Sequence, residues 1–105
     1  MDLSDLTLEK AKAFEGTEFV VTLADGRTLT MTLDEVVPFE RHERRRSRGA
    51  TPKRAPFSLY FLGPPSEVLP QGMYRFESAT VSFANLFIVP IGRDEESTEY
   101  EAVFT

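Results

Sequence analysis

The residues best suited to binding chemistry gather in one basic segment in the middle of the chain. Residues 41–54 hold seven basic residues against one acidic residue, a net charge of +6. Guanidinium groups bind phosphate and carboxylate oxygens through paired hydrogen bonds, so this segment is suited to an anionic partner. The candidate partner-binding residues are Arg41, Arg44, Arg45, Arg46, Arg48, Lys53 and Arg54.

Three interpretations of this basic segment stay open. It is a solvated loop, a docking site for an acidic protein surface, or a site for nucleic acid or another polyanion. The rest of the chain holds five basic and 16 acidic residues, a net charge of −11, so association between copies of the chain is electrostatically favourable. The same acidic body would repel a long polyanion. No aromatic residues alternate with the arginines, so stacking on nucleic-acid bases is not indicated.

Catalytic and metal-binding patterns are weak in this sequence. The single histidine, His42, lies among arginines, and its nearest carboxylates are Glu40 and Glu43. Residues 94–96 are three consecutive acids, whose side chains point in different directions and do not make a Ca²⁺ ligand loop. The absence of cysteine excludes disulfides and zinc–thiolate sites. We therefore expect a protein that is not an enzyme and that carries no metal or cofactor.

Length and composition indicate one folded unit. The 105 residues are 41% hydrophobic and 11% aromatic, which suits a single domain over residues 1–105 with one core. The first residues have neither the basic nor the apolar region of a secretion signal. The longest apolar stretch is too short to span a membrane, so we expect a cytoplasmic protein that does not bind membranes.

A β-hairpin is the clearest local element. Apolar and polar residues alternate over residues 17–23 and again over 27–33, on either side of Asp25-Gly26. Alternation around an Asp-Gly pair predicts two antiparallel strands joined by a turn with positive φ at both turn positions. The second strand is expected to end near Pro38.

Four more strands follow a long loop at residues 40–56. They are expected at 56–63, 72–78, 81–92 and 98–105. The run 81–92 is apolar on both faces, which predicts that it is covered on both sides, with a bulge or an unpaired position at Pro90.

The remaining patterns place the helix and the aromatic residues. Residues 8–15 predict a short helix capped by Thr7 and followed by Gly16 in the left-handed region. Gly72 is expected in a turn with positive φ. The aromatic core is expected to contain Tyr74, Phe76, Phe87, Tyr100 and Phe104.

These elements predict a mainly β fold. About six hairpin-connected strands, with a short N-terminal helix, favour a small antiparallel barrel or sandwich that carries the Arg-rich loop 40–56. A barrel of six strands is expected to have an interior filled by side chains.

The C-terminal half carries four motifs: PFSLYFLGP, LPQGMYRFE, LFIVPIGRD and YEAVF. Through them the chain resembles a family of small bacterial proteins known as a domain of unknown function. The resemblance covers about residues 6–37 and 55–105. Members of that family are often encoded near proteins with phage tail-collar-like domains, which implies an accessory part of a tail-like or surface assembly. The family implies no catalytic residues.

The leading hypothesis is therefore a non-enzymatic structural or protein-interaction component of such an assembly. The partner is expected to be a protein, with self-association as one form of this binding. Two alternatives stay open. One is polyanion binding through the Arg-rich loop, and the other is a barrel that binds a small ligand or acts as an enzyme at its mouth.

Overall fold

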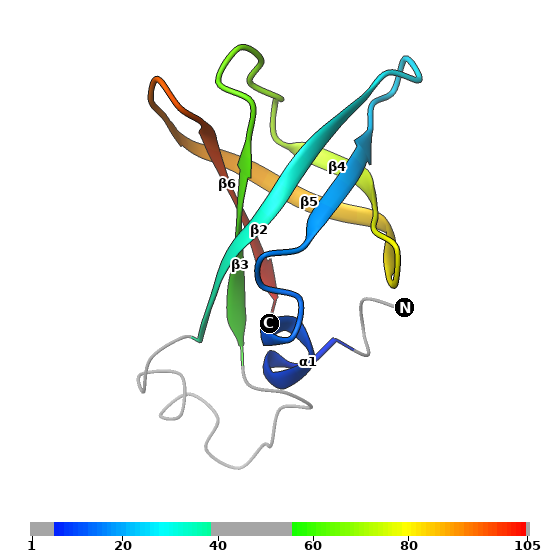
Figure 1. Cartoon of the computed structure of the whole chain (residues 1–105), viewed down its shortest axis with the longest axis vertical. Coiled ribbons are helices and arrows are strands. Elements are labelled where there is room, and N and C mark those ends of the chain that lie inside the picture. Colours follow the sequence, from blue (N-terminus) through cyan, green and yellow to red (C-terminus); the bar gives the residue numbers. More distant parts are fainter. Residues whose placement is uncertain (1–5, 39–55, 105) are drawn as a thin grey trace.

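Six antiparallel strands close into a barrel in the computed structural model, which describes residues 6–38 and 56–104 (Figure 1). Around the barrel the order is β1-β2-β3-β6-β5-β4, and every neighbouring pair is antiparallel. The predicted mainly β fold is confirmed, in its barrel form. The strands are β1 (Glu18–Thr22), β2 (Thr28–Pro38), β3 (Phe57–Gly63), β4 (Gly72–Glu77), β5 (Ser82–Arg93) and β6 (Thr98–Phe104).

The β1–β2 hairpin forms where the alternation predicts it, but its turn differs from the predicted one. The N–H of Gly26 donates to the carbonyl of Leu23, and the N–H of Leu23 donates to the carbonyl of Arg27. Only Gly26 in this turn has a positive φ, of 90°. The connection is therefore a three-residue loop that ends in a left-handed glycine, rather than a two-residue turn with positive φ at both positions.

One short helix, α1 (Leu8–Lys12), packs against β2 at one end of the barrel (Figure 1). The Thr7 hydroxyl caps it by accepting from the N–H of Lys10, as predicted. The helix ends three residues earlier than expected and continues as a turn to Gly16, which has a φ of 88°. The Glu15 carboxylate accepts from the N–H of Val36, 2.8 Å away, and this bond ties the turn to β2 beside its bulge.

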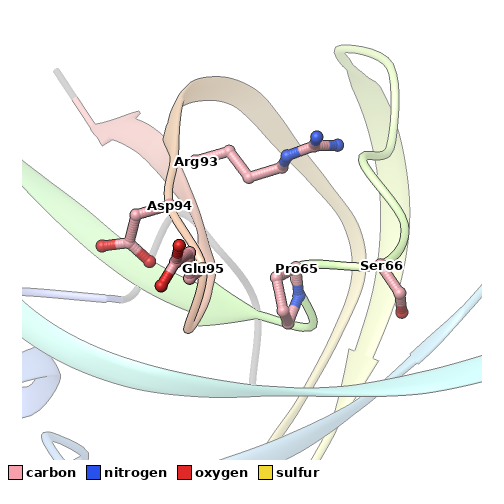
Figure 2. Close-up of a pocket in the computed structure, with 5 residues that line it drawn as sticks. All are labelled: Pro65, Ser66, Arg93, Asp94 and Glu95. Carbon is pink, nitrogen blue, oxygen red and sulfur yellow. The ribbon is translucent and has the colours of Figure 1, made fainter.

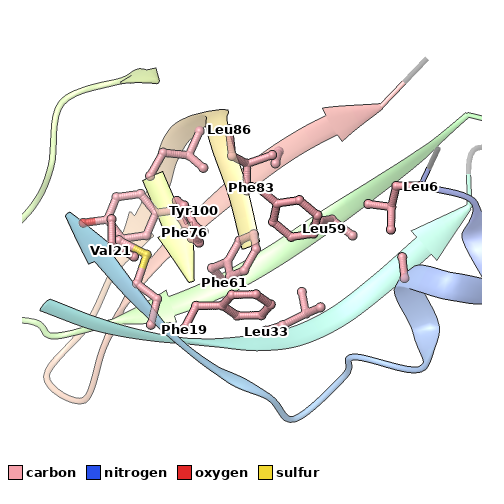
Figure 3. Packing of buried hydrophobic residues seen from close by; sticks show 14 of the residues in the cluster. Leu6, Phe19, Val21, Leu33, Leu59, Phe61, Phe76, Phe83, Leu86 and Tyr100 are labelled. Carbon is pink, nitrogen blue, oxygen red and sulfur yellow. The ribbon is translucent and has the colours of Figure 1, made fainter. Parts of the chain in front are cut away.

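Aromatic rings fill the middle of the barrel (Figure 3). The Phe19 ring lies 5.9 Å from that of Phe61 in an edge-to-face arrangement and 5.9 Å from the stacked ring of Phe83. Phe61 and Phe76 are 4.8 Å apart. All four side chains are buried, so the interior of the described barrel is occupied by side chains, as expected for six strands.

Tyr100 fastens the connection between β3 and β4 to the end of the barrel opposite α1. Its ring is fully buried, and its hydroxyl accepts from the N–H of Leu69 at 2.9 Å. The same hydroxyl lies 3.4 Å from the carbonyl of Glu67, to which it donates. Burial raises the pKa of this hydroxyl, so it stays protonated and able to donate.

Strand β5 corrects one prediction about the core. Leu86 and Ile88 are buried, but Phe87 and Ile91 are nearly half exposed, so the apolar run 81–92 is not covered on both faces. Phe87 is therefore not part of the aromatic core. The predicted irregularity at Pro90 is present as a register shift between Pro90 and Gly92. Gly72 begins β4 without a positive φ, so the turn predicted there is wrong.

Candidate functional site

Three connections gather at the end of the barrel away from α1: β1–β2, β3–β4 and β5–β6 (Figure 1). An open hollow of about 490 Å³ lies between the last two. Figure 2 shows the residues that line it: Pro65, Ser66, Arg93, Asp94 and Glu95. Within the described residues, Arg93 makes no ion pair and is exposed. An exposed guanidinium with two acidic neighbours is a weak anion site, because water and those carboxylates compete with a ligand.

The carboxylate of Asp94 holds the β5–β6 turn together. One of its oxygens accepts from the N–H of Glu96 at 2.8 Å and from the N–H of Ser97 at 2.9 Å. These two hydrogen bonds hold the pKa of Asp94 below its usual value. This side chain therefore has a structural task in the turn. No group of three or more metal-binding side chains occurs in the part of the chain that the structure describes.

Arg27 links two of the three connections. Its guanidinium bonds to Asp25 at 2.8 Å and to Glu67 at 3.0 Å, beside a hollow of about 270 Å³. The backbone N–H and the guanidinium of Arg27 both bond to Asp25 and lower the pKa of that carboxyl. Since two carboxylates already neutralise Arg27, it has little charge left for an external anion. This hollow therefore does not carry a strong case for a ligand site.

A polar cluster lies on the outer side of β3 and β6. The hydroxyls of Ser58 and Tyr60 both donate to the same Glu101 oxygen, at 2.9 and 3.0 Å. Desolvation, and next the bond to Glu101, raise the pKa of Tyr60. The two hydroxyls hold the Glu101 carboxylate in one orientation. Glu101 is on β6, and Glu99 is another outward position of the same strand. The cluster fixes a negative charge on the outer surface of the barrel.

Beside this charge, large apolar side chains are exposed on three consecutive strands of the barrel. Met73 on β4 is opposite Phe87 on β5, and their side chains are 66% and 45% exposed. Val103 on β6 is 52% exposed. Glu101 pairs with Val89 on the antiparallel strand β5, so Val103, two residues after Glu101, lies on the same side of this pair as Phe87, two residues before Val89. We call Met73, Phe87 and Val103 the apolar row. Apolar side chains gathered on an outer face are typical of an interaction surface.

The sequence contained a signal for this row that the prediction did not use. On β6 the outward positions are Glu99, Glu101 and Val103, so Val103 shares the exposed side with two glutamates. On β5, Phe87 stands between Leu86 and Ile88, both buried. Strict alternation therefore assigns Phe87 to the outer face, although its apolar character suggested the core.

The predicted basic site lies outside the described residues. Arg41, Arg44, Arg45, Arg46, Arg48, Lys53 and Arg54 all belong to residues 39–55, as does His42. Binding through them therefore stays a prediction. What the structure does give is the place where their segment is attached, because Pro38 at the end of β2 is paired with Phe57 at the start of β3.

Comparison with known proteins identifies the family. A family model, the domain of unknown function DUF6916, matches residues 6–104, and the chain belongs to this family. No curated protein and no solved structure shows significant similarity to it. Among the residues that the structure describes, no helix has the length and hydrophobicity needed to cross a membrane.

Proposed function

We propose that this member of the DUF6916 family is a non-enzymatic structural or protein-interaction component that binds a protein partner through the outer face of β4, β5 and β6. The observation that carries the proposal is the apolar row. Met73, Phe87 and Val103 gather on one face, whereas seven other rings are buried in the core: Phe19, Phe57, Phe61, Phe76, Phe83, Tyr100 and Phe104. An aromatic side chain flanked by Met and Val is suited to be the centre of a protein interface.

The inside of the barrel supports the same proposal. Strands that bind a small ligand usually surround a space, whereas here Phe19, Phe61 and Phe76 occupy the middle of the described barrel. The hollows at the barrel end are open and are bordered by charged groups that already take part in turns and ion pairs. The outer face is therefore the more favourable surface for function.

A tail-like or surface assembly is the first place to look for the partner. This finer proposal rests on the motifs in the C-terminal half, whose family resemblance implies neighbours with phage tail-collar-like domains. A rigid closed barrel also suits a part that is added to an assembly, because it presents an outer face with no free sheet edge between its paired strands.

A comparative pull-down tests the proposed function. Tagged wild-type protein and the double variant Met73→Ser/Phe87→Ser would be incubated with extract from the source organism, and bound proteins identified by mass spectrometry. Val68→Ser is the matched control, because Val68 is 42% exposed but lies in the β3–β4 connection. We expect a stoichiometric protein that the wild type and the control retain and the double variant loses.

Three results would contradict the proposal. Equal recovery by the wild type and the double variant would remove the apolar row as the binding surface. Recovery of nucleic acid that is lost on raising the salt, and on changing Arg44, Arg45 and Arg46 to Ser, would instead favour the polyanion alternative. Turnover of a defined substrate by the purified protein would contradict the non-enzymatic assignment.

A further inference from the structure

The surroundings of the apolar row point to the chemistry of its partner. We infer that the row is covered by a basic segment of another protein, in which an apolar side chain packs on Phe87 and a nearby Lys or Arg pairs with Glu101. This inference rests on the proposed interaction surface and names the chemistry of its occupant. Its support is a band of carboxylates that borders the row on the described barrel.

Three carboxylates form this band. Tyr60 on β3 is paired with Glu101 on β6 and with Glu35 on β2, so the two glutamates lie at the same level of the barrel. Glu99 is the next outward position of β6. We call Glu35, Glu99 and Glu101 the acidic band. Val103 follows Glu101 by two residues, so the apolar row begins about 7 Å from the band along the strand. One segment of a partner can therefore contact both.

The acidic band has no cation from the described barrel. The ion pairs that the described residues make with one another join Arg27 to Asp25 and Glu67, and Arg75 to Glu77. None of them includes a residue of the band. The described residues hold thirteen acidic and five basic side chains, a net charge of −8, so the barrel as a whole also attracts a positively charged partner.

Glu101 is already arranged to receive a cation. The hydroxyls of Ser58 and Tyr60 both donate to its Oε2, and its Oε1 accepts no hydrogen bond from the described residues. Because the two hydroxyls fix the carboxylate, it loses little side-chain freedom when a partner binds. Desolvation raises the pKa of Tyr60 most, and Glu101 and then Glu99 raise it further, which shows that both negative charges act at this place.

The same charges disfavour the other occupants. A second copy of the barrel brings the same net charge of −8 and is repelled. Nucleic acid and anionic lipid would place phosphates against the acidic band. An uncharged apolar partner would cover the partly buried Glu99 and Glu101 without pairing them, and a carboxylate that is desolvated and unpaired costs free energy. A segment that is both apolar and basic satisfies the row and the band together.

A peptide selection on the purified full chain tests this inference. Random dodecapeptides displayed on phage are selected for binding to the wild type. They are counted only when Met73→Ser/Phe87→Ser abolishes their binding, which sets aside peptides that bind elsewhere on the chain. We expect the counted peptides to combine an aromatic or aliphatic residue with Lys or Arg close to it in the sequence.

Titration of one counted peptide, followed by fluorescence anisotropy, then measures the two parts of the contact. Phe87→Ser should raise the dissociation constant at least about tenfold, since an aromatic side chain at the centre of an interface commonly contributes that much. Glu99→Gln/Glu101→Gln should raise it about fivefold and reduce its dependence on salt. These amides remove the charges but keep an oxygen that can accept from Ser58 and Tyr60.

Strand β1 provides a matched control for each part, because it lies opposite β6 in the ring of six strands. Val20→Ser removes an apolar side chain that is 44% exposed, and Glu18→Gln removes an exposed carboxylate. Both should leave the dissociation constant unchanged, and thermal unfolding should show that every variant is folded. An effect of Glu18→Gln equal to that of the Glu99→Gln/Glu101→Gln variant would overturn the pairing with the acidic band.

The outcomes separate this inference from the proposed function. Counted peptides that are acidic or uncharged overturn the basic partner and keep the interaction surface. A dimer in sedimentation equilibrium that Phe87→Ser dissociates also overturns it, because a second copy would then be the occupant. A selection that gives no peptide dependent on the row overturns the inference. If the double variant Met73→Ser/Phe87→Ser also retains every protein that the wild type captures from extract, the proposed function is overturned with it.

Discussion

At the scale of single residues, the hydroxyl of Tyr100 is a polar atom that holds part of the described barrel together. It joins the ring-filled interior to the backbone of the β3–β4 connection through its bonds with Leu69 and Glu67. Leu69 is itself buried, so this contact helps to close the barrel end. A tyrosine at this position therefore makes two hydrogen bonds that a phenylalanine could not make.

The first prediction is that Tyr100→Phe destabilises the protein. The change leaves the ring packed but removes the acceptor for the N–H of Leu69, and an unpaired buried donor costs about 1–3 kcal/mol. Urea unfolding followed by circular dichroism measures the loss. Tyr74→Phe is the control, because its hydroxyl bonds to the carbonyl of Pro70 at an exposed site where water can replace it. Equal losses in the two variants would contradict the role given to Tyr100.

The second prediction concerns the pH dependence carried by Asp94. Its two backbone N–H bonds favour the charged form, so its pKa in the folded state lies below the ordinary value of 3.8. A carboxyl with a lowered pKa adds stability above its unfolded pKa and loses it as the pH falls through the folded pKa. NMR titration should therefore give Asp94 a midpoint below 3.8.

Asp94→Asn is the matching variant for this titration. It keeps an oxygen that can accept from Glu96 and Ser97 but has no charge to lose. Its stability should fall less than that of the wild type between pH 5 and the acid limit, a range that spans the ordinary carboxyl pKa. A normal midpoint for Asp94, or equal acid sensitivity of the two proteins, would argue against the turn that these bonds describe.

At the scale of elements, Gly63 at the end of β3 lies close against side chains of β2 and β6. A Cβ atom placed there would lie 3.3 Å from Cγ of Met31 and 3.3 Å from Cε1 of Tyr100. Both neighbours are fully buried, so neither can move away into solvent. The third prediction is that Gly63→Ala lowers the free energy of unfolding by about 1–3 kcal/mol, as overpacked cores commonly do.

Gly92→Ala is a control for this change within the same fold. Gly92 also lies in a strand without a positive φ, but a Cβ there would meet no atom within 4 Å. Its stability should stay within about 0.5 kcal/mol of the wild type, as is usual for an exposed position. Thermal unfolding of both variants makes the comparison. Similar losses would show that strand propensity, and not the contact with Tyr100, decides the effect.

The elements also show how far the sequence determines the fold. The hairpin followed from strict alternation, because a period of two places every second side chain on one face. The turn type did not follow, since Asp-Gly suits both a two-residue and a three-residue loop, and only the hydrogen bonds of Leu23 decide between them. The helix ended early because the Glu15 side chain and Gly16 bond to β2.

The candidate site was harder to predict than the fold. An apolar residue in a strand is ordinarily assigned to the core, and Phe87 was assigned there for that reason. Its neighbours across the sheet, Met73 on one side and the Glu101 strand on the other, belong to segments far away in the sequence. A surface that spans three strands becomes visible only once their register is known.

At the scale of the whole molecule, the barrel and the basic segment supply different groups for binding. The barrel supplies the apolar row and the acidic residues, and residues 39–55 supply most of the positive charge. Their attachment points, Pro38 and Phe57, are paired with each other across β2 and β3. The strands therefore need no more than a short connection at this end to keep their register.

The last prediction is that deletion of residues 42–53 leaves the barrel folded and weakens any binding of nucleic acid. Six residues, 39–41 and 54–56, would still connect the paired Pro38 and Phe57, and loop length affects stability only weakly, so the thermal midpoint should stay within a few degrees. The deletion removes five of the seven basic residues of this segment, so any binding of nucleic acid through it should weaken. Calorimetry and a nucleic-acid binding assay at low salt, both on one preparation of the deletion variant, measure the two effects. A large fall in the midpoint would show that the segment packs on the barrel and belongs to the fold. An unchanged midpoint with unchanged capture of the protein partner would remove the segment from the interface and leave the apolar row to act without it.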